Sequence, residues 1–502
     1  MKLTLKFLLL FISLILSEKC SRIQENTWTQ FRGTNSLGIA PESATPPLEL
    51  NSEKNLAWKI PLASGLSSPC IFEGRIFMTG FNPTDSALIT YCIDSKTGSK
   101  LWEQSVSPDT LEVIHHIGSH AVATPTTDGN NVYVYFASYG VVCFDPEGKL
   151  LWEHRLAVIN GLWGSGASPI VHDSLLIINR GDPTKEDILA IDCRTGKTVW
   201  DHILGIASSA PLPANFSSAT PVIWRDKVVI HRAFELNAIN LKDGNESWTI
   251  PIVTAGVSTP VIMNDILYVN GFFNSGDSRF RDEVPDFDVM TAKYDTNQDR
   301  LISFSEIPSE WLFYRRPELK LTAELDTLLS IRDFARYFGF DSNKDNVFGK
   351  EEWNKMKEFQ SGFLFDNAVL AFKLDSARGS DRPGVLWKEK EYVSEIPSLL
   401  VLDDKVYMVT NGGILSCYEA KTGKLLFRER LKAPGGYFAS PLYAGGNIYF
   451  ASYNGRITVI RPGDKLNIVA QSDLHERIGA SPVALGKMLF IRTETGLYAF
   501  NK

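Results

Sequence analysis

The chain has 502 residues, of which 44% are hydrophobic, so it can bury one very large core or several ordinary ones. Its formal net charge of -7 argues against nucleic acid as a main partner, because a protein that binds a duplex needs a basic face. Composition therefore excludes a typical nucleic-acid-binding protein and is compatible with a large globular one.

The N-terminus has the pattern of an export signal. Lys2 and Lys6 form a charged start, and residues 7–16 form an apolar run that is too short to span a bilayer. We expect residues 1–19 to be a signal peptide, and the protein to be periplasmic or associated with the outer membrane or cell surface. Cys20 is a candidate for a lipid anchor. Plain secretion is the alternative, because the three residues before this cysteine fit a lipidation signal poorly.

A short motif, clearest at residues 190–200, recurs along most of the chain. It reads as the end of a strand, a tight turn in which glycine supplies a positive φ, and a returning strand that ends in tryptophan. Its first position, which we call the slot, is usually a small residue. The eight slots are Cys92, Cys143, Ala190, Ala238, Ala371, Cys417, Thr458 and Ala499.

Each repeat also begins with an entry in which serine or threonine adjoins proline. Between entry and slot lies a β-rich run, so each unit holds four short strands in about forty residues, which fits one blade of a β-propeller. The entries are Ser68, Thr124, Ser168, Thr220, Thr259, Ser398, Ser440 and Ser481.

The last unit ends at Lys502 after three strands, and residues 55–60 supply the missing fourth strand. Pairing of these segments would close the ring. We therefore predict an all-β, eight-bladed propeller formed by residues 55–272 and 366–502, preceded by an N-terminal extension at residues 20–54. Seven blades are the alternative if one weak unit is misread.

Three of the cysteines, Cys92, Cys143 and Cys417, occupy slots in separate units. Other units fill this position with alanine or threonine, so we interpret these cysteines as small buried residues and expect no disulfides between them.

The motif Ala-x-Asp-x-x-Thr-Gly-Lys-x-x-Trp at residues 190–200 resembles the tryptophan-docking repeat of the pyrroloquinoline-quinone-like (PQQ-like) β-propellers. Residues 28–33 and 55–59 are similar to the entry segment of exported bacterial members. The resemblance covers roughly residues 28–272 and 366–502. It implies that tryptophans pack between neighbouring blades, and these are Trp102, Trp152, Trp200, Trp248 and Trp387.

Residues 273–365 interrupt the fifth unit, and their composition changes to helix formers and charges. We predict a small all-α insertion with two acidic loops that match the EF-hand pattern. Oxygen donors occupy loop positions 1, 3, 5, 7 and 12, and this spacing wraps six or more oxygens around one Ca²⁺. The predicted ligands are Asp295, Asn297, Asp299, Leu301 and Glu306 in the first loop, and Asp341, Asn343, Asp345, Val347 and Glu352 in the second.

The two loops differ at position 6, where an EF-hand normally has glycine. Arg300 and Asn346 stand there, and arginine in a left-handed conformation costs about 1 kcal/mol or more. We expect the second loop to bind Ca²⁺ better.

Position 8 is apolar in both loops, at Ile302 and Phe348, as expected for a short β contact between them. The alternative is a degenerate pair kept for its fold. The flanking helices are predicted at residues 288–294, 304–314, 325–338 and 351–359.

The sequence favours a non-catalytic function. The fold that the chain resembles also includes quinoprotein dehydrogenases. In those enzymes a quinone is stacked between a tryptophan and a disulfide of adjacent cysteines, with Ca²⁺ beside it. This chain has no adjacent cysteines and no matching Glu, Asn and Asp set, so PQQ is not expected and no catalytic residue is assigned. A quinoprotein-type, PQQ-dependent oxidoreductase is the alternative function.

Two further features have a functional and a structural interpretation. His115, His116 and His120 lie between the first two units and could ligate a metal or be ordinary polar loop residues. Trp163 could stack on a ligand, or pack against a neighbouring blade.

We expect an exported binding or scaffold protein whose loop-rich face binds a protein or a surface glycan, with calcium-binding EF-hands beside it. Its architectural analogues are propeller lipoproteins that assist outer-membrane barrel assembly. A calcium-regulated sensor is a further alternative, but ambient Ca²⁺ outside the cytoplasm is often steady, which favours a structural role.

Overall fold

The computed structural model describes residues 27–115, 117–159, 165–181, 187–203, 217–252, 254, 256–272, 281–315, 328–337, 339–362, 367–374 and 382–502. The expected signal peptide, Cys20, His116 and Trp163 lie outside these residues.

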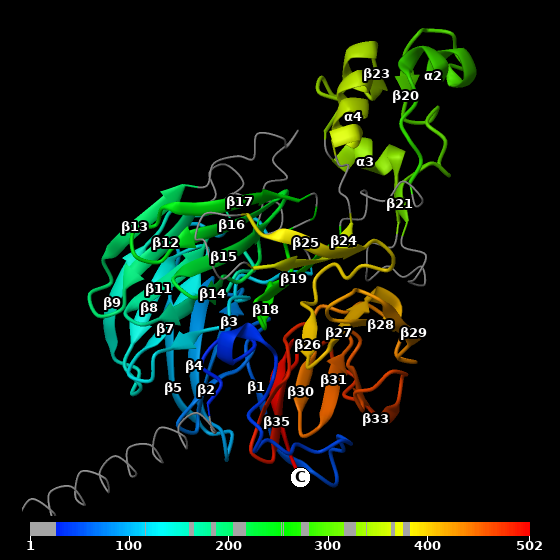
Figure 1. Cartoon of the computed structure of the whole chain (residues 1–502). Coiled ribbons are helices and arrows are strands. Elements are labelled where there is room, and N and C mark those ends of the chain that lie inside the picture. Colours follow the sequence, from blue (N-terminus) through cyan, green and yellow to red (C-terminus); the bar gives the residue numbers. More distant parts are fainter. Residues whose placement is uncertain are drawn as a thin grey trace, which may run out of the picture.

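Eight four-stranded antiparallel sheets surround a central axis (Figure 1), which confirms the prediction of eight blades. The innermost strand of each blade is very short, and the outer three are longer. In blades one to four the strands are β2 (Cys70–Phe72), β3 (Arg75–Asn82), β4 (Ala87–Asp94) and β5 (Lys100–Val106); β6 (Thr126–Thr127), β7 (Val132–Phe136), β8 (Gly140–Phe144) and β9 (Leu150–Arg155); β10 (Ile170–His172), β11 (Leu175–Asn179), β12 (Asp187–Asp192) and β13 (Thr198–Ile203); and β14 (Val222–Trp224), β15 (Lys227–Arg232), β16 (Glu235–Asn240) and β17 (Glu246–Pro251).

The remaining blades follow the same order, and the last one takes its outer strand from the N-terminal part of the chain. They are β18 (Val261–Met263), β19 (Ile266–Gly271), β24 (Ala368–Lys373) and β25 (Gly384–Glu389); β26 (Leu400–Leu402), β27 (Lys405–Thr410), β28 (Ile414–Glu419) and β29 (Leu425–Arg430); β30 (Leu442–Ala444), β31 (Asn447–Ala451), β32 (Arg456–Ile460) and β33 (Ile468–Asp473); and β34 (Val483–Leu485), β35 (Met488–Arg492), β36 (Gly496–Asn501) and β1 (Leu56–Pro61). A short 3-10 turn, η4 (Asn411–Gly413), joins β27 to β28.

Strand β1 closes the ring as predicted. It pairs antiparallel with β36, with Trp58 opposite the slot residue Ala499. Because an N-terminal strand and three C-terminal strands form one sheet, the last blade is complete and the ring is closed.

The slot residue and the tryptophan form a cross-strand pair. Ala190, for example, lies opposite Trp200, and its side chain is fully buried. The Trp200 indole Nε1 donates to the Leu241 carbonyl of the next blade at 2.8 Å. A Cβ added to Gly244 in that blade would lie 2.8 Å from the indole ring, so only glycine fits there. Trp102, Trp152 and Trp387 donate equivalent bonds to carbonyls of the next blade at 2.8 to 3.0 Å, so docking between blades is confirmed for these four tryptophans.

The Ser/Thr entries form a closed ring of hydrogen bonds around the axis. In each blade the backbone N–H of the entry residue donates to the side-chain hydroxyl of the next entry, at 2.9 to 3.2 Å. The last bond, from Ser481 N–H to Ser68 Oγ, returns to the first blade. All eight entry residues are buried, so their hydroxyls satisfy backbone groups that water does not reach.

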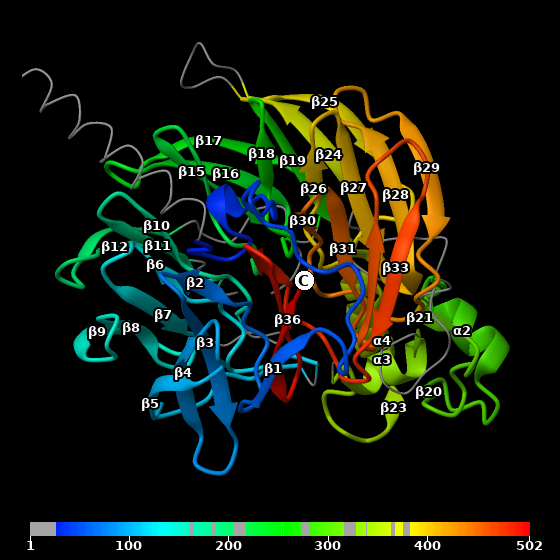
Figure 2. The same ribbon diagram turned by 90° about the horizontal axis from the view of Figure 1, so that it is seen from below.

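The N-terminal segment covers one end of the ring (Figure 2). Trp28 bridges to Ile71 in blade one, and the short helix η1 (Thr34–Ser36) lies against β14 in blade four. Arg32 Nη2 donates to the Leu399 carbonyl of blade six at 2.7 Å. Further contacts reach blade two from Thr29, blade seven from Ile39 and blade eight from Thr45. We call this end the N-terminal face.

A helical insertion stands on the opposite end, the insertion face (Figure 1). It separates β19 from β24, so it replaces the hairpin between the two middle strands of blade five. No helix in the described part of the chain is long and apolar enough to cross a membrane. The insertion contains α2 (Phe287–Tyr294), β20 (Ile302–Ser303), β21 (Leu312–Arg315), β22 (Leu328–Ser330), α3 (Ile331–Tyr337), β23 (Val347–Phe348) and α4 (Lys350–Gly362).

The prediction that the insertion is all-α was wrong at residues 304–314. Turns and the strand β21 occupy this segment, and β21 pairs with β22. Pro308 cannot donate a helical hydrogen bond, and Leu312 exchanges backbone and side-chain hydrogen bonds with Asp282 instead. The next helix is shorter than predicted because residues 328–330 are extended.

Candidate functional site

The first acidic loop is organised around its own carboxylates. Asp295 Oδ1 accepts the backbone N–H of Asp299 at 3.2 Å, and Oδ2 accepts that of Arg300 at 2.9 Å. The side-chain oxygens Asn297 Oδ1 and Asp299 Oδ1 accept further backbone N–H groups of the loop. These bonds turn the oxygens of positions 1, 3 and 5 towards the inside of one loop.

Glu306 closes this loop at position 12. Its Oε1 accepts the Thr296 backbone N–H at 2.7 Å, and its Oε2 accepts the Ser303 N–H and Oγ–H, both at 2.9 Å. Burial raises the pKa of Glu306, but the hydrogen bonds together outweigh burial and bring the pKa down to about 2. The carboxylate is therefore ionised at neutral pH, as a cation ligand must be.

The second loop repeats the arrangement residue by residue. Asp341 accepts the backbone N–H groups of Asp345 and Asn346 at 3.1 and 2.9 Å. Glu352 Oε1 accepts the Ser342 N–H at 3.0 Å, but its Oε2 has only a long, 3.4 Å contact from Gly349 N–H. The closing carboxylate of the second loop is thus held less firmly than Glu306.

Position 6 is left-handed in both loops, as the EF-hand pattern requires. The φ angles are 61° at Arg300 and 67° at Asn346. Asparagine adopts this conformation more readily than arginine, so the first loop carries more backbone strain. Residues at position 8 also behave as predicted: Ile302 pairs with Phe348 in the two-stranded sheet β20–β23, and both side chains are fully buried.

The donor chemistry of both loops suits a hard cation such as Ca²⁺. At positions 1, 3, 5 and 12 each loop has two aspartates, one asparagine and one glutamate, and the loop backbone is already curved around them. In the described ranges, however, no three His, Cys, Asp or Glu side chains stand close enough to form a metal site by themselves. Any cation would therefore also need the amide and backbone oxygens of the loops.

The two described histidines before blade two, His115 and His120, have different surroundings. His120 Nδ1 lies 3.3 Å from Glu112 Oε2, and both side chains are nearly buried. The imidazole also packs edge-on against Phe81. His115 instead lies at a local turn, where its carbonyl accepts the Gly118 N–H. The His120–Glu112 pair could not be predicted from the sequence, because no local pattern distinguishes Glu112 from the other carboxylates of the chain.

Buried polar side chains on the second strands support neighbouring blades. Asn179 Nδ2 donates to the Ala219 carbonyl at 3.0 Å, and Asn270 Nδ2 donates to the Pro397 carbonyl at 3.3 Å. His231 bonds the Ser258 carbonyl at 3.0 Å, and burial lowers its pKa to about 4. These groups fix the segments that lead into the hydroxyl ring.

The slot cysteines Cys92, Cys143 and Cys417 are buried, as expected, and the other two described cysteines are buried as well. Cys70, Cys92, Cys143, Cys193 and Cys417 are all free and buried. Burial raises the pKa of each thiol, for example to about 12 in Cys417, so none of these five is a reactive thiolate at neutral pH.

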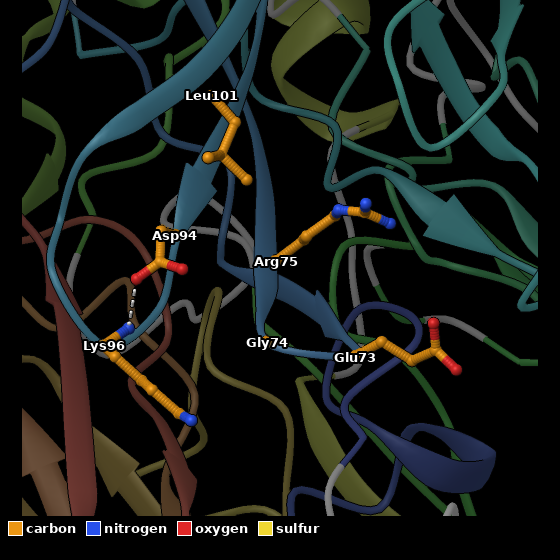
Figure 3. A pocket seen from close by; sticks show the side chains of 6 residues that line it. All are labelled: Glu73, Gly74, Arg75, Asp94, Lys96 and Leu101. Atoms are coloured by element: carbon orange, nitrogen blue, oxygen red, sulfur yellow. Dashed lines mark hydrogen bonds between the residues drawn. The ribbon is translucent and has the colours of Figure 1, made fainter.

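A surface hollow lies on the N-terminal side of blade one (Figure 3). Its side chains are engaged locally: Asp94 Oδ1 accepts the Lys96 N–H at 3.0 Å, and Arg75 pairs with Glu147 of blade two at 3.2 Å. The Asp94 turn is one copy of the repeated turn, so we interpret the hollow as structural. Its lining residues are Glu73, Gly74, Arg75, Asp94, Lys96 and Leu101.

The sequence matches the PQQ-like repeat family described as outer membrane protein assembly factor BamB, over residues 49–162, 85–275 and 373–502. Comparison with curated protein sequences finds no significant match.

Solved structures of similar fold include both assembly factors and enzymes. BamB from Moraxella catarrhalis is 12% identical with a TM-score of 0.51, covering 89% of this chain and 99% of its own. A europium-containing methanol dehydrogenase is 12% identical with a TM-score of 0.56, covering 97% and 100%. The quinohemoprotein alcohol dehydrogenase of Comamonas testosteroni is 12% identical with a TM-score of 0.53, covering 95% and 81%. Identities this low show the shared fold alone.

Proposed function

The chain belongs to the PQQ-like repeat family of outer membrane protein assembly factor BamB, and from this premise we propose that it is an exported, non-catalytic scaffold with calcium-binding EF-hands. Its partner would be a protein or a surface glycan bound at the loop-rich insertion face. The observation that carries the calcium assignment is the residue-by-residue repetition of one loop geometry at two places.

Calcium would be held by the side chains at positions 1, 3, 5 and 12 and by the backbone carbonyl at position 7. The bound ion would supply positive charge that offsets the mutual repulsion of the loop carboxylates. We assign the tighter site to the second loop. Asn346 accepts the left-handed turn at lower cost than Arg300, and Glu352 has fewer competing hydrogen bonds to give up than Glu306.

The non-catalytic assignment is supported by the chain's cysteines and by its N-terminal segment. No two cysteines are adjacent in the sequence, and the five described ones lie buried in the blades. The N-terminal segment fills one end of the ring, with Arg32 buried against Leu399. The alternative, a quinoprotein-type oxidoreductase, draws on the shared fold with two dehydrogenases.

Export and lipid anchoring complete the proposal and give it an orientation. Residues 21–27 separate the candidate anchor Cys20 from Trp28, which lies on the N-terminal face. A chain of this length spans at most roughly 30 Å. An anchored molecule would therefore turn its N-terminal face to the membrane and its insertion face away from it.

Calorimetry on single-loop variants tests the calcium assignment. Titration of Ca²⁺ into the Glu352→Gln protein should lose the tighter binding event, because a neutral amide cannot close the shell in bidentate fashion. Glu351→Gln is the matched control, since Glu351 pairs with Lys355 on the outer surface of α4. Equal heats for wild type and Glu352→Gln would remove the assignment. Equilibrium dialysis with PQQ and Ca²⁺ tests the alternative, and tight quinone binding would favour the oxidoreductase.

A further inference from the structure

The insertion is joined to the propeller through a hairpin of blade four. We propose that Phe234, at the tip of this hairpin, is an internal anchor held by the hydrophobic core of the insertion. Cation binding in the acidic loops is thereby coupled to the insertion face of the ring. This inference rests on the proposed calcium function and adds to it a route by which the loops act on the propeller.

Phe234 has an unusual backbone conformation. It lies between β15 and β16 with a φ of 72°, in the left-handed region that bulky residues rarely occupy. Two backbone hydrogen bonds hold it there, from Phe234 N–H to the Thr254 carbonyl at 3.1 Å and from Ile252 N–H to the Phe234 carbonyl at 2.8 Å. A strained aromatic residue persists only where its surroundings fix it, so its side chain must have a good packing partner.

That partner is the core of the insertion. Phe234 is only 7% exposed, and with Ala233 it belongs to one buried cluster with residues of all three helices of the insertion. Val257, from the segment leading to blade five, packs against the same cluster. The members from the insertion are Val284, Phe287, Met290, Ile302, Phe304, Ile307, Phe313, Ile331, Phe334, Ala335, Phe348, Trp353 and Met356.

The same cluster reaches the acidic loops. Ile302 and Phe348, which follow position 7 of each loop and pair in β20–β23, are both members. The ring of Phe348 also lies edge-on to Phe304 and to Trp353, at centroid distances of 5.0 and 6.0 Å. One continuous apolar core therefore extends from the loop backbones to the tip of the blade-four hairpin.

On its other side, the hairpin is tied to the hydroxyl ring. His231, at the end of β15, bonds Thr254 Oγ1 at 2.9 Å and the Ser258 carbonyl at 3.0 Å. Ser258 is followed by Thr259, one of the eight ring residues. Contact is close along this path, since a Cβ added to Gly256 would lie 2.4 Å from the backbone nitrogen of Ala233. A shift of the hairpin would thus move the segment that enters blade five.

Coupling of this kind is reciprocal. If cation binding fixes the insertion core around Phe234, it must also stabilise the hydrogen bonds at the hairpin tip. Conversely, if cation binding favours the packed position of Phe234 by a given factor, the packed side chain strengthens cation binding by that same factor. Loss of the side chain should therefore weaken cation binding by this factor. EF-hand proteins bind apolar segments of their partners in a hydrophobic groove, and here the apolar segment would come from the same chain.

Hydrogen exchange and calorimetry on the full-length protein test the coupling. In wild type, Ca²⁺ should slow exchange of the Phe234 and Ile252 amides relative to chelator by roughly fivefold or more. Phe234→Ala should remove this difference and weaken Ca²⁺ binding by a similar factor. Phe234→Gly should do the same while relieving the backbone strain, so it separates loss of the anchor from misfolding.

Tyr139→Ala is the matched control. Tyr139 is a buried aromatic residue in the corresponding hairpin of blade two, and its cluster includes none of the insertion residues that the structure describes. This variant should keep both the exchange difference and the Ca²⁺ affinity. Wild-type Ca²⁺ affinity in Phe234→Gly, with unchanged exchange protection, would overturn the coupling and leave the calcium assignment intact. Absence of any Ca²⁺ heat in wild type would overturn the calcium assignment itself, and the coupling with it.

Discussion

In the propeller one set of contacts is repeated in eight blades around a closed ring, whereas in the insertion two acidic loops meet at a single pair of short strands. The propeller is thus stabilised by many equivalent contacts, each between neighbours. In the insertion each loop depends on its own few oxygens and on one shared core. Substitutions in the ring should therefore change stability, and substitutions in the loops should change cation binding.

The largest effect is expected from a docking tryptophan. Trp200→Ala should lower the free energy of unfolding by about 3–5 kcal/mol, because it removes a buried indole and its hydrogen bond to the next blade. Chemical denaturation measures this loss. Trp224→Ala is the control, since Trp224 is only half-buried and its hydrogen bond to the next blade, to Asp265 at 3.1 Å, is exposed, so the substitution should cost much less. Equal losses in the two variants would show that docking between blades is not what holds the ring.

A smaller effect is expected from acid at the ring closure. Glu476 accepts hydrogen bonds from Lys59 on β1 at 2.7 Å and from Tyr498 on β36 at 2.6 Å. Burial raises the pKa of Glu476, but its hydrogen bonds, first that from Lys59, lower it to about 2. Because the folded pKa lies below the unfolded value of 4.5, this contribution is present above pH 4.5 and lost as pH falls through 2.

We expect the loss to be about 2 kcal/mol, allowing for the partial exposure of the pair. Unfolding curves of wild type and Glu476→Gln should differ at neutral pH and converge near pH 2. A constant difference across this range would contradict the assignment.

The hydroxyl ring offers a test of similar or smaller size. Ser68→Ala leaves the buried backbone N–H of Ser481 without an acceptor and should cost about 1–3 kcal/mol. Ser440→Ala removes the equivalent bond between blades six and seven and should cost about the same. Thermal unfolding of both proteins measures this, and a neutral effect at both sites would show that the ring adds little.

The smallest effect is expected at position 6 of the first loop. Arg300→Gly relieves a left-handed arginine and should tighten Ca²⁺ binding by about 1 kcal/mol, whereas Asn346→Gly should change it less. Calorimetry on both variants compares the loops directly. A larger gain from Asn346→Gly would reverse our ranking of the two sites.

Local, repeated signals made the propeller predictable. The pairing of Ala190 with Trp200 recurs in nearly every unit, and the unit without a fourth strand pointed to the closing strand β1. The hydroxyl ring was visible only as a Ser/Thr-Pro pattern, because its bonds join residues from 39 to 413 positions apart, which only the closed ring brings together.

The insertion was predictable in its loops and less so between them. Spacing alone indicated the carboxylates and the pairing of Ile302 with Phe348. The segment around Pro308 was wrongly predicted as a helix because of its helix-forming composition. Its extended form depends on the hydrogen bonds between Leu312 and Asp282, which no local sequence pattern reveals. Likewise, no periodicity connects Phe234 to the insertion, since that contact depends on how one element sits on another.

One measurement tests the central claim, that cation binding belongs to the insertion of an otherwise structural propeller. Ca²⁺ is titrated calorimetrically into wild type and into the double variant Glu306→Gln/Glu352→Gln. Both closing carboxylates are partly exposed, and far-UV circular dichroism of the calcium-free proteins checks that the double variant is folded. We expect all specific binding heat to be lost in the double variant. Retention of a wild-type isotherm would place the cation elsewhere in the molecule and contradict the account.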